Sequence, residues 1–463
     1  MTATADATLE VVNPATGESI ASVPNMSADE VDAAVERAQR ALPEWLDATP
    51  GERSELLLKL ADVISDNAEE LAQIESRNVG KPISLAREEM PFAADNLRFF
   101  AGAARNLEGK STGEYIKGYT SMVRREPIGI VAGICPWNYP LMMAVWKMGP
   151  ALAAGNVQIL KPAEQTPLSL LRFLELAKDA IPEDVLQAVT GDGVPTGARL
   201  VSHAAIGLVS LTGDVSTGKL IAKNAADTLK RVHLELGGKA PMVVFDDADP
   251  EAVAEGIKIA GYANSGQDCT AGSRVIAGPK IYDALLEALV PAVESLNVGD
   301  PASSEEIEMG PVISADQQER IFGFLERAKG ATVLTGGRSQ GDRGWFVTPT
   351  VITDVAQDDE IVQNEVFGPV VTVQKFADDA QAIEWANGVQ YGLAASVWTR
   401  DIGRALSAAR KLQFGCVWIN DHLVPIASEM PHGGYKSSGY GKDMSAYSME
   451  EYTQIKHVVA KLD

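Results

Sequence analysis

Cysteine and histidine are scarce in this sequence of 463 residues. Its three cysteines lie far apart, at positions 135, 269 and 416, which makes a disulfide-stapled secreted fold implausible and indicates a reducing compartment. The five histidines, at positions 203, 233, 422, 432 and 457, show no metal-ligand spacing with one another or with a cysteine. We therefore expect no structural zinc, and we assign no metal ligand.

Long apolar runs and an excess of positive charge are also missing. No stretch reaches the roughly 18 apolar residues of a membrane-spanning helix, and the N-terminus lacks the basic and apolar regions of a signal peptide. The chain has 40 Lys and Arg against 63 Asp and Glu, a net charge of −23 at pH 7, which argues against a nucleic-acid partner and attracts cations. These absences favour a cytoplasmic protein that binds neither membrane nor nucleic acid.

Short apolar runs alternate with helical patterns from Pro127 onward. Runs that are apolar on both faces indicate parallel strands covered by helices. A second alternating set, from Pro241 to Ile419, predicts another α/β domain, and a chain of this length is too long for one core. A polar segment between Gly109 and Arg125 predicts a strand pair that packs against a partner subunit. The apolar runs of the first set are 128–134, 157–160, 185–189, 206–211 and 232–236, with helices at about 141–154, 168–180, 196–202 and 216–226.

Cys269 is the candidate nucleophile. It follows a small polar segment, 261–268, after a predicted helix, so that a small molecule can approach its thiol. By contrast, Cys416 lies inside the apolar run 414–419 and is expected to be a buried small hydrophobe. Cys135, at a strand end, is open to either interpretation.

Two polar residues near strand ends are candidates to assist a thiol. Glu235 lies in an apolar run, two residues before the pair Gly237 and Gly238. A carboxylate that is poorly solvated there has a raised pKa, which suits a general base. Asn138 lies at a strand-to-helix corner, where its amide can donate to an oxyanion, although a plain turn residue fits the same corner.

Residues at the ends of two further strands are candidates to bind a ligand. Residues 206–218 follow the pattern of a strand, a glycine turn at Gly213 and a helix, and the free N–H groups at such a helix start bind phosphate. Asp214 in this turn would repel a phosphate unless it points away. Lys161 and Glu164 follow another strand, where they either meet a ligand in the crevice of an α/β sheet or form a solvated surface pair.

A series of short motifs stands along the chain: PWN at 136–138, KPAEQTP at 161–167, LTG at 211–213, ELGGK at 235–239, GQDC at 266–269, EVFGPV at 365–370 and SGYG at 438–441. With the NPATGE turn at 13–18, these motifs resemble the aldehyde dehydrogenase superfamily in identity, order and spacing. The resemblance implies an α/β fold with three parts. They are a Rossmann-like NAD-binding domain (1–110 and 127–236), an α/β catalytic domain (237–437) and a small β oligomerisation arm (111–126 and 438–463).

The resemblance also implies a mechanism. Cys269 would attack an aldehyde carbonyl to form a thiohemiacetal, and Asn138 with the backbone N–H of Cys269 would stabilise the oxyanion. Glu235 would activate the water that hydrolyses the resulting thioester. NAD would be the cofactor, since a carboxylate at Glu164 repels the ribose phosphate of NADP. The family commonly has serine at the position of Asp214, which therefore receives no cofactor role. The residues implied to bind NAD are Trp137, Lys161, Glu164, Gly213, Glu365 and Phe367.

The substrate implied by the resemblance is cationic. Tyr139, Trp146 and Asp268 are similar to the pocket of enzymes that oxidise aminoaldehydes, where aromatic faces and a carboxylate attract an ammonium group. The stretch 428–445 resembles bacterial γ-aminobutyraldehyde dehydrogenases, which implies a role in putrescine and polyamine breakdown. Betaine aldehyde is the second candidate substrate, and broad aldehyde specificity is a further alternative.

Other activities are compatible with single features of the sequence. A CoA-acylating dehydrogenase would share Cys269, whereas Glu235 favours hydrolysis. A cysteine hydrolase would need a histidine base, for which His203 and His233 are candidates. The segment 111–126 and the C-terminal strand predict a homo-oligomer, either a dimer or a tetramer.

Overall fold

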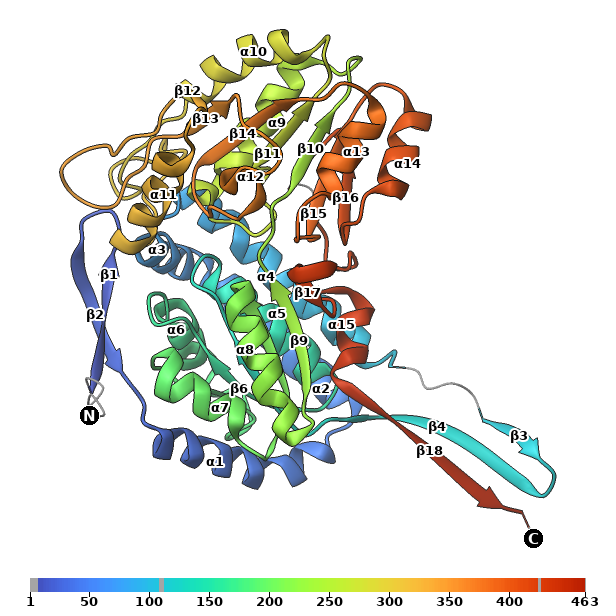
Figure 1. The fold of residues 1–463 in the computed structure, drawn as a ribbon. Helices are drawn as coiled ribbons and strands as arrows, with labels where there is room; N and C mark the ends of the chain where they lie inside the picture. The colour runs from blue at the N-terminus through green and yellow to red at the C-terminus, as the bar shows by residue number, and fades with distance from the viewer. Residues whose placement is uncertain (1–6, 108–111, 424–425, 463) are drawn as a thin grey trace.

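The computed structural model describes residues 7–107, 112–423 and 426–462, which form two α/β units and a β-ladder (Figure 1). The lower unit in this view contains a six-stranded sheet, and the upper unit contains a seven-stranded sheet. The predicted α/β fold is confirmed. The predicted domain boundary between residues 110 and 111 lies outside the described residues. Among the helices in the described ranges, none is long and apolar enough to cross a membrane.

The six-stranded sheet of the first unit is parallel except at one edge. Its order is β17-β9-β8-β5-β6-β7, and β17 runs antiparallel to β9. The apolar side chains of its central strands are buried in one core with those of the surrounding helices, as the alternating pattern predicts. The strands are β5 (Ile130–Ile134), β6 (Val157–Lys161), β7 (Leu186–Ala188), β8 (Ile206–Gly213), β9 (Arg231–Leu236) and β17 (Gly439–Tyr440).

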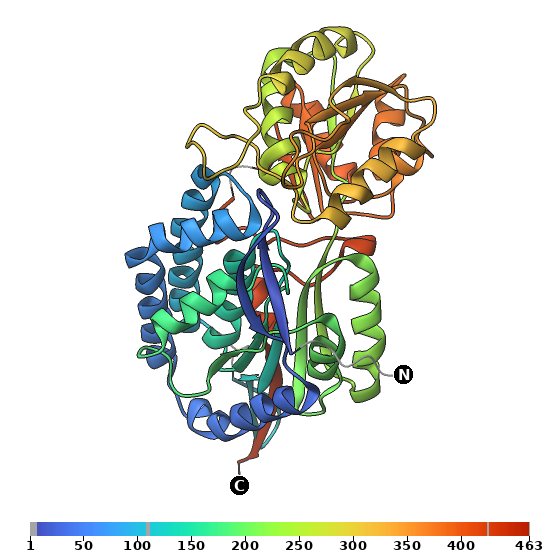
Figure 2. The same ribbon diagram turned by 90° about the vertical axis from the view of Figure 1, so that its left-hand side faces the viewer.

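Two helices of the first unit begin at residues that favour a helix start. Ser27 and Glu30 form a capping box at the first helix, and Pro140 opens the helix after β5, where its missing N–H costs nothing. An N-terminal hairpin runs along this unit (Figure 2), and its turn accepts a hydrogen bond at Pro14 O from Trp345 N–H of the second unit. The elements are β1 (Thr8–Asn13), β2 (Glu18–Pro24), α1 (Ala28–Leu46), α2 (Pro50–Asp66), α3 (Ala68–Val79), α4 (Ile83–Ala104), α5 (Pro140–Ala153), α6 (Leu168–Ala177), α7 (Ala198–Ser202), α8 (Val215–Ala225) and α15 (Ser445–Glu451).

The seven-stranded sheet has the order β12-β13-β14-β11-β10-β15-β16, and its strands are parallel apart from β12. Residues 237–240 connect β9 to β10, so the chain passes between the two units at this point. The strands are β10 (Pro241–Val244), β11 (Arg274–Ala277), β12 (Thr332–Thr335), β13 (Thr350–Thr353), β14 (Val370–Lys375), β15 (Ala394–Trp398) and β16 (Cys416–Ile419). The helices are α9 (Pro250–Tyr262), α10 (Tyr282–Glu294), α11 (Ala315–Arg327), α12 (Glu360–Gln363), α13 (Asp379–Asn387) and α14 (Ile402–Lys411).

The β-ladder extends away from both units (Figure 1). Its order is β18-β4-β3, and β18 (Thr453–Lys461) pairs antiparallel with β4 (Tyr119–Pro127) along its whole length. The strand β3 (Gly113–Ile116) completes the strand pair that the polar segment predicts. Tyr115 and Ile455 on this ladder are exposed, at 78% and 66% of their surface.

The predicted arm of residues 438–463 is longer than the segment that enters the ladder. Residues 439–440 form β17 in the six-stranded sheet, and α15 contacts α4 and α5. The reason is packing, because Met449 and Tyr452 are buried in the core of the first unit. Only the strand β18 leaves that core.

Candidate active site

The strand order of the six-stranded sheet reverses at β5. The next strands, β6 and β7, lie on one side of β5, and β8 and β9 lie on the other. In parallel sheets a ligand crevice opens outside the carboxyl ends of the strands at such a switch point. A cavity of about 610 Å³ opens there, lined by Trp137 after β5 and by Thr212 and Gly213 at the end of β8.

Most of the residues predicted to form the site line this one cavity. Lys161 and Glu164, at the end of β6, are not among its lining residues. The predicted residues that line it are Trp137, Asn138, Tyr139, Trp146, Gly213, Glu235, Asp268, Cys269, Glu365 and Phe367.

The segment before Cys269 is held in an unusual backbone conformation. Asn264, Ser265 and Gly266 have positive φ angles of 48°, 58° and 67°, which non-glycine residues adopt only when their surroundings impose it. The Asn264 amide donates to Asn138 O at 3.1 Å, and the Ser265 hydroxyl donates to Gly310 O at 2.8 Å. These buried hydrogen bonds hold the turn that presents Cys269.

The double glycine after Glu235 allows two backbone segments to approach closely. A Cβ atom on Gly238 would lie 2.1 Å from Cys269 O, and one on Gly237 would lie 2.2 Å from Glu365 Oε2. Real Cβ atoms do not come this close, so only glycine fits at position 238, against backbone, whereas a side chain at 237 would require the Glu365 carboxylate to move. The glycines therefore bring Glu235, Cys269 and Glu365 to the same cavity wall.

Cys269 and Glu235 are in direct contact. The Cys269 Sγ lies 3.7 Å from Glu235 Oε1, the thiol donating and the carboxylate accepting. Burial raises the pKa of the Cys269 thiol well above its ordinary value, and the carboxylates of Glu235 and Asp268 add to this effect. Burial also raises the pKa of Glu235, whose side chain is 1% exposed. The pair therefore consists of a protonated thiol beside a carboxylate of raised basicity.

Two hydrogen-bond donors lie beside the thiol. Asn138 is buried, and its Nδ2 donates one hydrogen bond, to Gln267 O at 2.9 Å. The second N–H of this amide can therefore donate to another acceptor. In the part of the chain that the structure describes, the backbone N–H of Cys269 has no hydrogen-bond acceptor. Both groups are thus available to an oxygen atom in the cavity.

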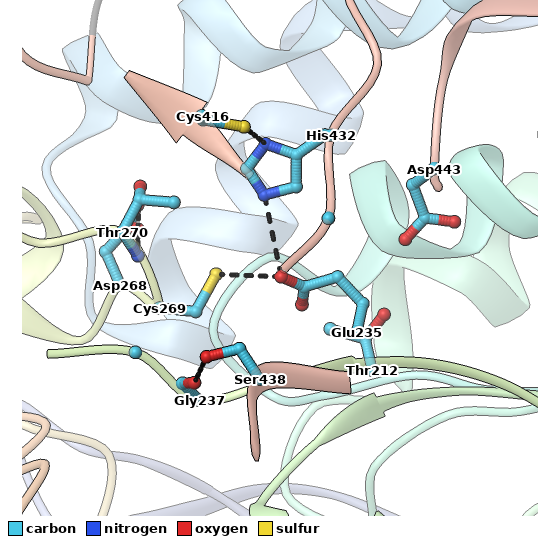
Figure 3. Close-up of polar contacts among 12 residues, drawn as sticks. Thr212, Glu235, Gly237, Asp268, Cys269, Thr270, Cys416, His432, Ser438 and Asp443 are labelled. Carbon is cyan, nitrogen blue, oxygen red and sulfur yellow. Dashed lines mark hydrogen bonds and ion pairs between the residues drawn. The ribbon is translucent and has the colours of Figure 1, made fainter. Parts of the chain in front are cut away.

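His432 is a residue of the site that the sequence reasoning did not place there. Its Nε2 lies 3.5 Å from Glu235 Oε1, and its Nδ1 lies 3.8 Å from Cys416 Sγ (Figure 3). Its ring packs against Trp146 with a centroid distance of 5.2 Å. His432 comes after β16, far in sequence from the other residues, and no local spacing pointed to it.

The contact with His432 corrects the expectation for Cys416. This cysteine is half-buried instead of being fully enclosed, because β16 is an edge strand of its sheet. Cys135 is buried, and burial raises the pKa of its thiol to about 12. The histidine candidates His203 and His233 bond to Ala205 N–H and Ser210 Oγ respectively, and neither lines the cavity.

The three predicted substrate residues form one side of the cavity. Tyr139 O–H donates to Asp268 Oδ2 at 2.8 Å, while Asp268 Oδ1 accepts from the Thr270 N–H at 2.6 Å, so Asp268 also caps a turn. The ammonium of Lys81 already lies over the Tyr139 ring, 4.3 Å from its centroid. The buried Trp146 has an indole N–H with no hydrogen-bond acceptor among the described residues.

The other end of the cavity is lined by Trp137, Phe367 and Glu365. The Trp137 and Phe367 rings meet edge to face at 5.2 Å, and Glu365 Oε1 accepts from Gly238 N–H at 2.7 Å. Burial raises the pKa of Glu365 to about 8. The aromatic pair can pack against a flat polar ring of a ligand, and the carboxylate can accept from hydroxyl groups next to that ring.

The predicted phosphate and ribose positions follow β8 and β6. Asp214 caps α8, because its Oδ1 accepts from the N–H and the hydroxyl of Ser216, so a carboxylate already occupies this helix start. Lys161 is buried with Nζ 3.6 Å from Glu164 Oε2, whereas the Glu164 side chain is 40% exposed. This pair is partly buried, unlike the solvated surface pair of the alternative interpretation.

Comparison with known proteins places the chain in one family. The sequence profile of the aldehyde dehydrogenase family matches residues 1–458. The chain is 41% identical over 462 residues to the aldehyde dehydrogenase of Emericella nidulans, covering 98% of this chain and 92% of that protein. The NAD⁺ complex of an aldehyde dehydrogenase from Bacillus cereus superposes with a TM-score of 0.96 at 43% identity, covering 98% of this chain and 94% of that one. A betaine aldehyde dehydrogenase from Staphylococcus aureus in complex with NAD⁺ gives a TM-score of 0.96 at 38% identity, covering 98% and 92%. The protein is thus a member of the aldehyde dehydrogenase family.

Proposed function

We propose that this protein oxidises an aldehyde to the carboxylate with NAD, through a covalent intermediate on Cys269. The observation that carries the proposal is the 3.7 Å contact between Cys269 Sγ and Glu235 Oε1 at the wall of the cavity. A partly exposed thiol next to a buried carboxylate can transfer its proton to that carboxylate during nucleophilic attack. Family membership supports the same chemistry.

In the first step the thiol of Cys269 attacks the aldehyde carbonyl. The raised pKa of the thiol means that it holds its proton at neutral pH, so Glu235 Oε1 accepts that proton as the carbon–sulfur bond forms. The raised pKa of Glu235 makes its carboxylate a better base for this transfer. The product is a thiohemiacetal with a developing negative charge on oxygen.

Two donors stabilise that oxygen. The remaining amide N–H of Asn138 and the backbone N–H of Cys269, two residues that line the cavity, would donate to it. Removing one such donor typically costs about 100-fold or more in rate. In the proposed mechanism Asn138 also positions the turn before Cys269, since its carbonyl accepts from Asn264.

The residues at the switch point fit NAD. Trp137, Phe367 and Glu365 would hold the nicotinamide and its ribose, and the partly exposed carboxylate of Glu164 would accept from the hydroxyls of the adenosine ribose. The turn at Gly213 would face the pyrophosphate, with the Asp214 carboxylate as an unfavourable neighbour. The chemistry that bound NAD supplies is acceptance of the hydride lost when the thiohemiacetal becomes a thioester.

Glu235 releases the proton from the first step to the solvent, and hydrolysis of the thioester on Cys269 then uses its carboxylate again. A water molecule between the Glu235 carboxylate and the thioester carbonyl loses its proton to that carboxylate as it attacks. As the carbon–sulfur bond breaks, the leaving sulfur takes that proton from Glu235, which regenerates both the thiol and the carboxylate. A carboxylate in this position favours water over CoA as the acyl acceptor.

For the substrate we propose a cationic aminoaldehyde, γ-aminobutyraldehyde. The negative charge of Asp268 supports this choice, because its two oxygens are bonded to Tyr139 and Thr270 but carry no counter-ion in direct contact among the described residues. Glu88 also lines the cavity and adds a carboxylate, whereas Glu89 is paired with Lys81. The consequence would be a role in putrescine breakdown.

Betaine aldehyde is the second candidate. The aromatic rings of Trp146 and Tyr139, which line the cavity, suit a quaternary ammonium, and one structural relative at 38% identity is a betaine aldehyde dehydrogenase. The occupied face of Tyr139 weakens this option, since Lys81 already lies there.

We further propose that the domains divide as the sequence suggests, with residues 1–110 and 127–236 holding NAD and 237–437 completing the catalytic site. The ladder of β3, β4 and β18 would pair with a second copy, giving a homo-oligomer, because it projects apolar side chains such as Tyr115 and Ile455 into solvent.

The deciding experiment measures NADH formation with the purified protein. γ-Aminobutyraldehyde, betaine aldehyde and hexanal are compared at equal concentration, with NAD or NADP, and Cys269→Ala is the control. We expect the highest kcat/KM for γ-aminobutyraldehyde with NAD and no turnover by the variant. Faster oxidation of hexanal would overturn the cationic substrate, and undiminished turnover by Cys269→Ala would overturn the covalent mechanism.

A further inference from the structure

Three metal-ligating atoms of different chemistry converge at the cavity wall. Cys269 Sγ, Glu235 Oε1 and His432 Nε2 all lie within 4.8 Å of one another (Figure 3). Glu235 lies at the end of β9, Cys269 in the turn before β11 and His432 in the segment after β16. The sequence spacing of these residues is far too wide for a recognisable metal motif, so only the fold brings them together.

The separations match the edges of a zinc tetrahedron. Zinc binds sulfur at about 2.3 Å and nitrogen or oxygen at about 2.0–2.2 Å, which puts neighbouring ligands about 3.3–3.6 Å apart. The Sγ–Oε1 distance is 3.7 Å and the Oε1–Nε2 distance is 3.5 Å. The third edge, Sγ–Nε2, is at most 4.8 Å and would have to shorten when a metal binds.

The surroundings also suit a bound cation. Glu235 Oε2 is buried and has no hydrogen-bond partner among the described residues, so this carboxylate is not satisfied by the protein. The opposite ring nitrogen of His432 faces Cys416 Sγ at 3.8 Å, and Trp146 packs on the ring, which together aim Nε2 at the site. Zinc-ligating histidines are commonly oriented through their other nitrogen in this way.

We propose that Glu235, Cys269 and His432 form a site for a thiophilic divalent cation, Zn²⁺ or its analogue Co²⁺, which inhibits the enzyme reversibly. One thiolate, one imidazole and one carboxylate favour such a metal over Mg²⁺ or Ca²⁺, and the fourth position opens to the cavity and takes a water molecule. On binding, the Cys269 S–H bond and the His432 Nε2–H bond break, both protons leave to the solvent, and sulfur–metal and nitrogen–metal bonds form without any change of oxidation state. The metal then binds the electron pair of Cys269 Sγ that would otherwise attack an aldehyde.

The first test measures binding directly, on the full-length protein without cofactor or substrate. Titration with Co²⁺ is expected to give one bound ion per chain, with tetrahedral visible bands and a thiolate-to-cobalt band in the near ultraviolet. Zn²⁺ should displace the cobalt and remove these bands. Because no turnover is measured, the result is independent of whether the proposed reaction is correct.

Variants identify the ligands. Cys269→Ala should abolish the thiolate band, and His432→Asn should weaken Co²⁺ binding by at least about tenfold. His432→Gln is the second substitution, used if thermal unfolding shows that His432→Asn is misfolded. Cys135→Ser is the matched control, because this buried thiol does not line the cavity, and it should keep the wild-type affinity.

A second measurement follows the chemical protection of Cys269. Zn²⁺ is expected to slow the alkylation of Cys269 by iodoacetamide, followed by mass spectrometry of the labelled peptide, and EDTA should restore it. His432→Asn should require at least about tenfold more Zn²⁺ for the same protection. The proposal is overturned by the absence of a thiolate band in the wild type, or by unchanged binding and protection in the His432 variants.

Discussion

The α-carbon of Gly238 lies directly against the backbone carbonyl of Cys269, so close that a methyl group there would be 2.1 Å from the oxygen. This contact joins the segment that carries Glu235 to the turn that carries the thiol. It explains why the chain has a glycine at this position, where the two halves of the proposed catalytic pair come from different units of the fold.

Gly238→Ala is therefore expected to displace the turn of Cys269. Overpacking of this kind costs about 1–3 kcal/mol of stability, and a shift of about 1 Å in a reacting group can cost about 100-fold in rate. Thermal unfolding and kcat/KM measure both effects. Gly193→Ala is the control, because a Cβ atom there meets no other atom within 4 Å. Equal activity of the two variants would show that the contact does not position the thiol.

Glu235→Gln removes the proposed base while it keeps the size of the side chain. We expect kcat to fall by about 100-fold to 10,000-fold, because the amide accepts neither the thiol proton nor the water proton. Steady-state NADH formation gives kcat, and iodoacetamide labelling checks that Cys269 is still accessible. A loss of less than about threefold would contradict the assignment of Glu235 as the base.

Asp268→Asn tests the charge of the substrate. Removing one negative charge beside the pocket should lower kcat/KM for γ-aminobutyraldehyde by about tenfold, or about 1.4 kcal/mol, more than for hexanal. Tyr139→Phe is the matched variant, since it removes the hydrogen bond to Asp268 and leaves the charge. The electrostatic account predicts that only Asp268→Asn discriminates between the two aldehydes. Equal losses for both substrates would rule it out.

Asp214→Ser is expected to strengthen NAD binding. A serine can still cap α8, and the carboxylate that now accepts from Ser216 would no longer face the pyrophosphate. Relief of this repulsion should lower the Kd for NAD by about fivefold, or about 1 kcal/mol, as measured by calorimetry. Asp214→Asn separates charge from shape and should give a similar gain. Weaker binding in both variants would show that Asp214 helps to hold the cofactor.

Glu451→Gln should change the pH dependence of stability. Burial and the neighbouring Asp443 raise the pKa of Glu451 from 4.5 to about 7, with the backbone N–H and the ammonium of Lys442 acting in the opposite direction. Between pH 4.5 and about pH 7 Glu451 is protonated in the folded state but not in the unfolded state, so the free energy of unfolding falls as the pH rises through this range. The variant is expected to be more stable than the wild type by about 1 kcal/mol at pH 8, allowing for partial exposure, and equal to it at pH 4. Denaturant titrations at both pH values measure the difference, and an equal gain at pH 4 and pH 8 would refute the titration argument.

The strands and helices and three site residues could be predicted from the sequence, because each depends on residues that are near one another in the chain. The alternation of apolar runs and helices from Pro127 predicted the parallel sheets. Cys269, Glu235 and Asn138 each carry their own chemistry on a strand end or turn, and all three line the same cavity.

The rest depended on contacts between segments that are distant in sequence. His432 enters the site only because the stretch after β16 folds back over Glu235. Cys416 looked buried in its apolar run, yet an edge strand leaves it half-exposed beside that histidine. Residues 438–452 join the first unit because Met449 and Tyr452 find a core there. Local pattern determines the elements and their chemistry, whereas packing decides which side chains meet, since burial and distance are properties of the whole fold.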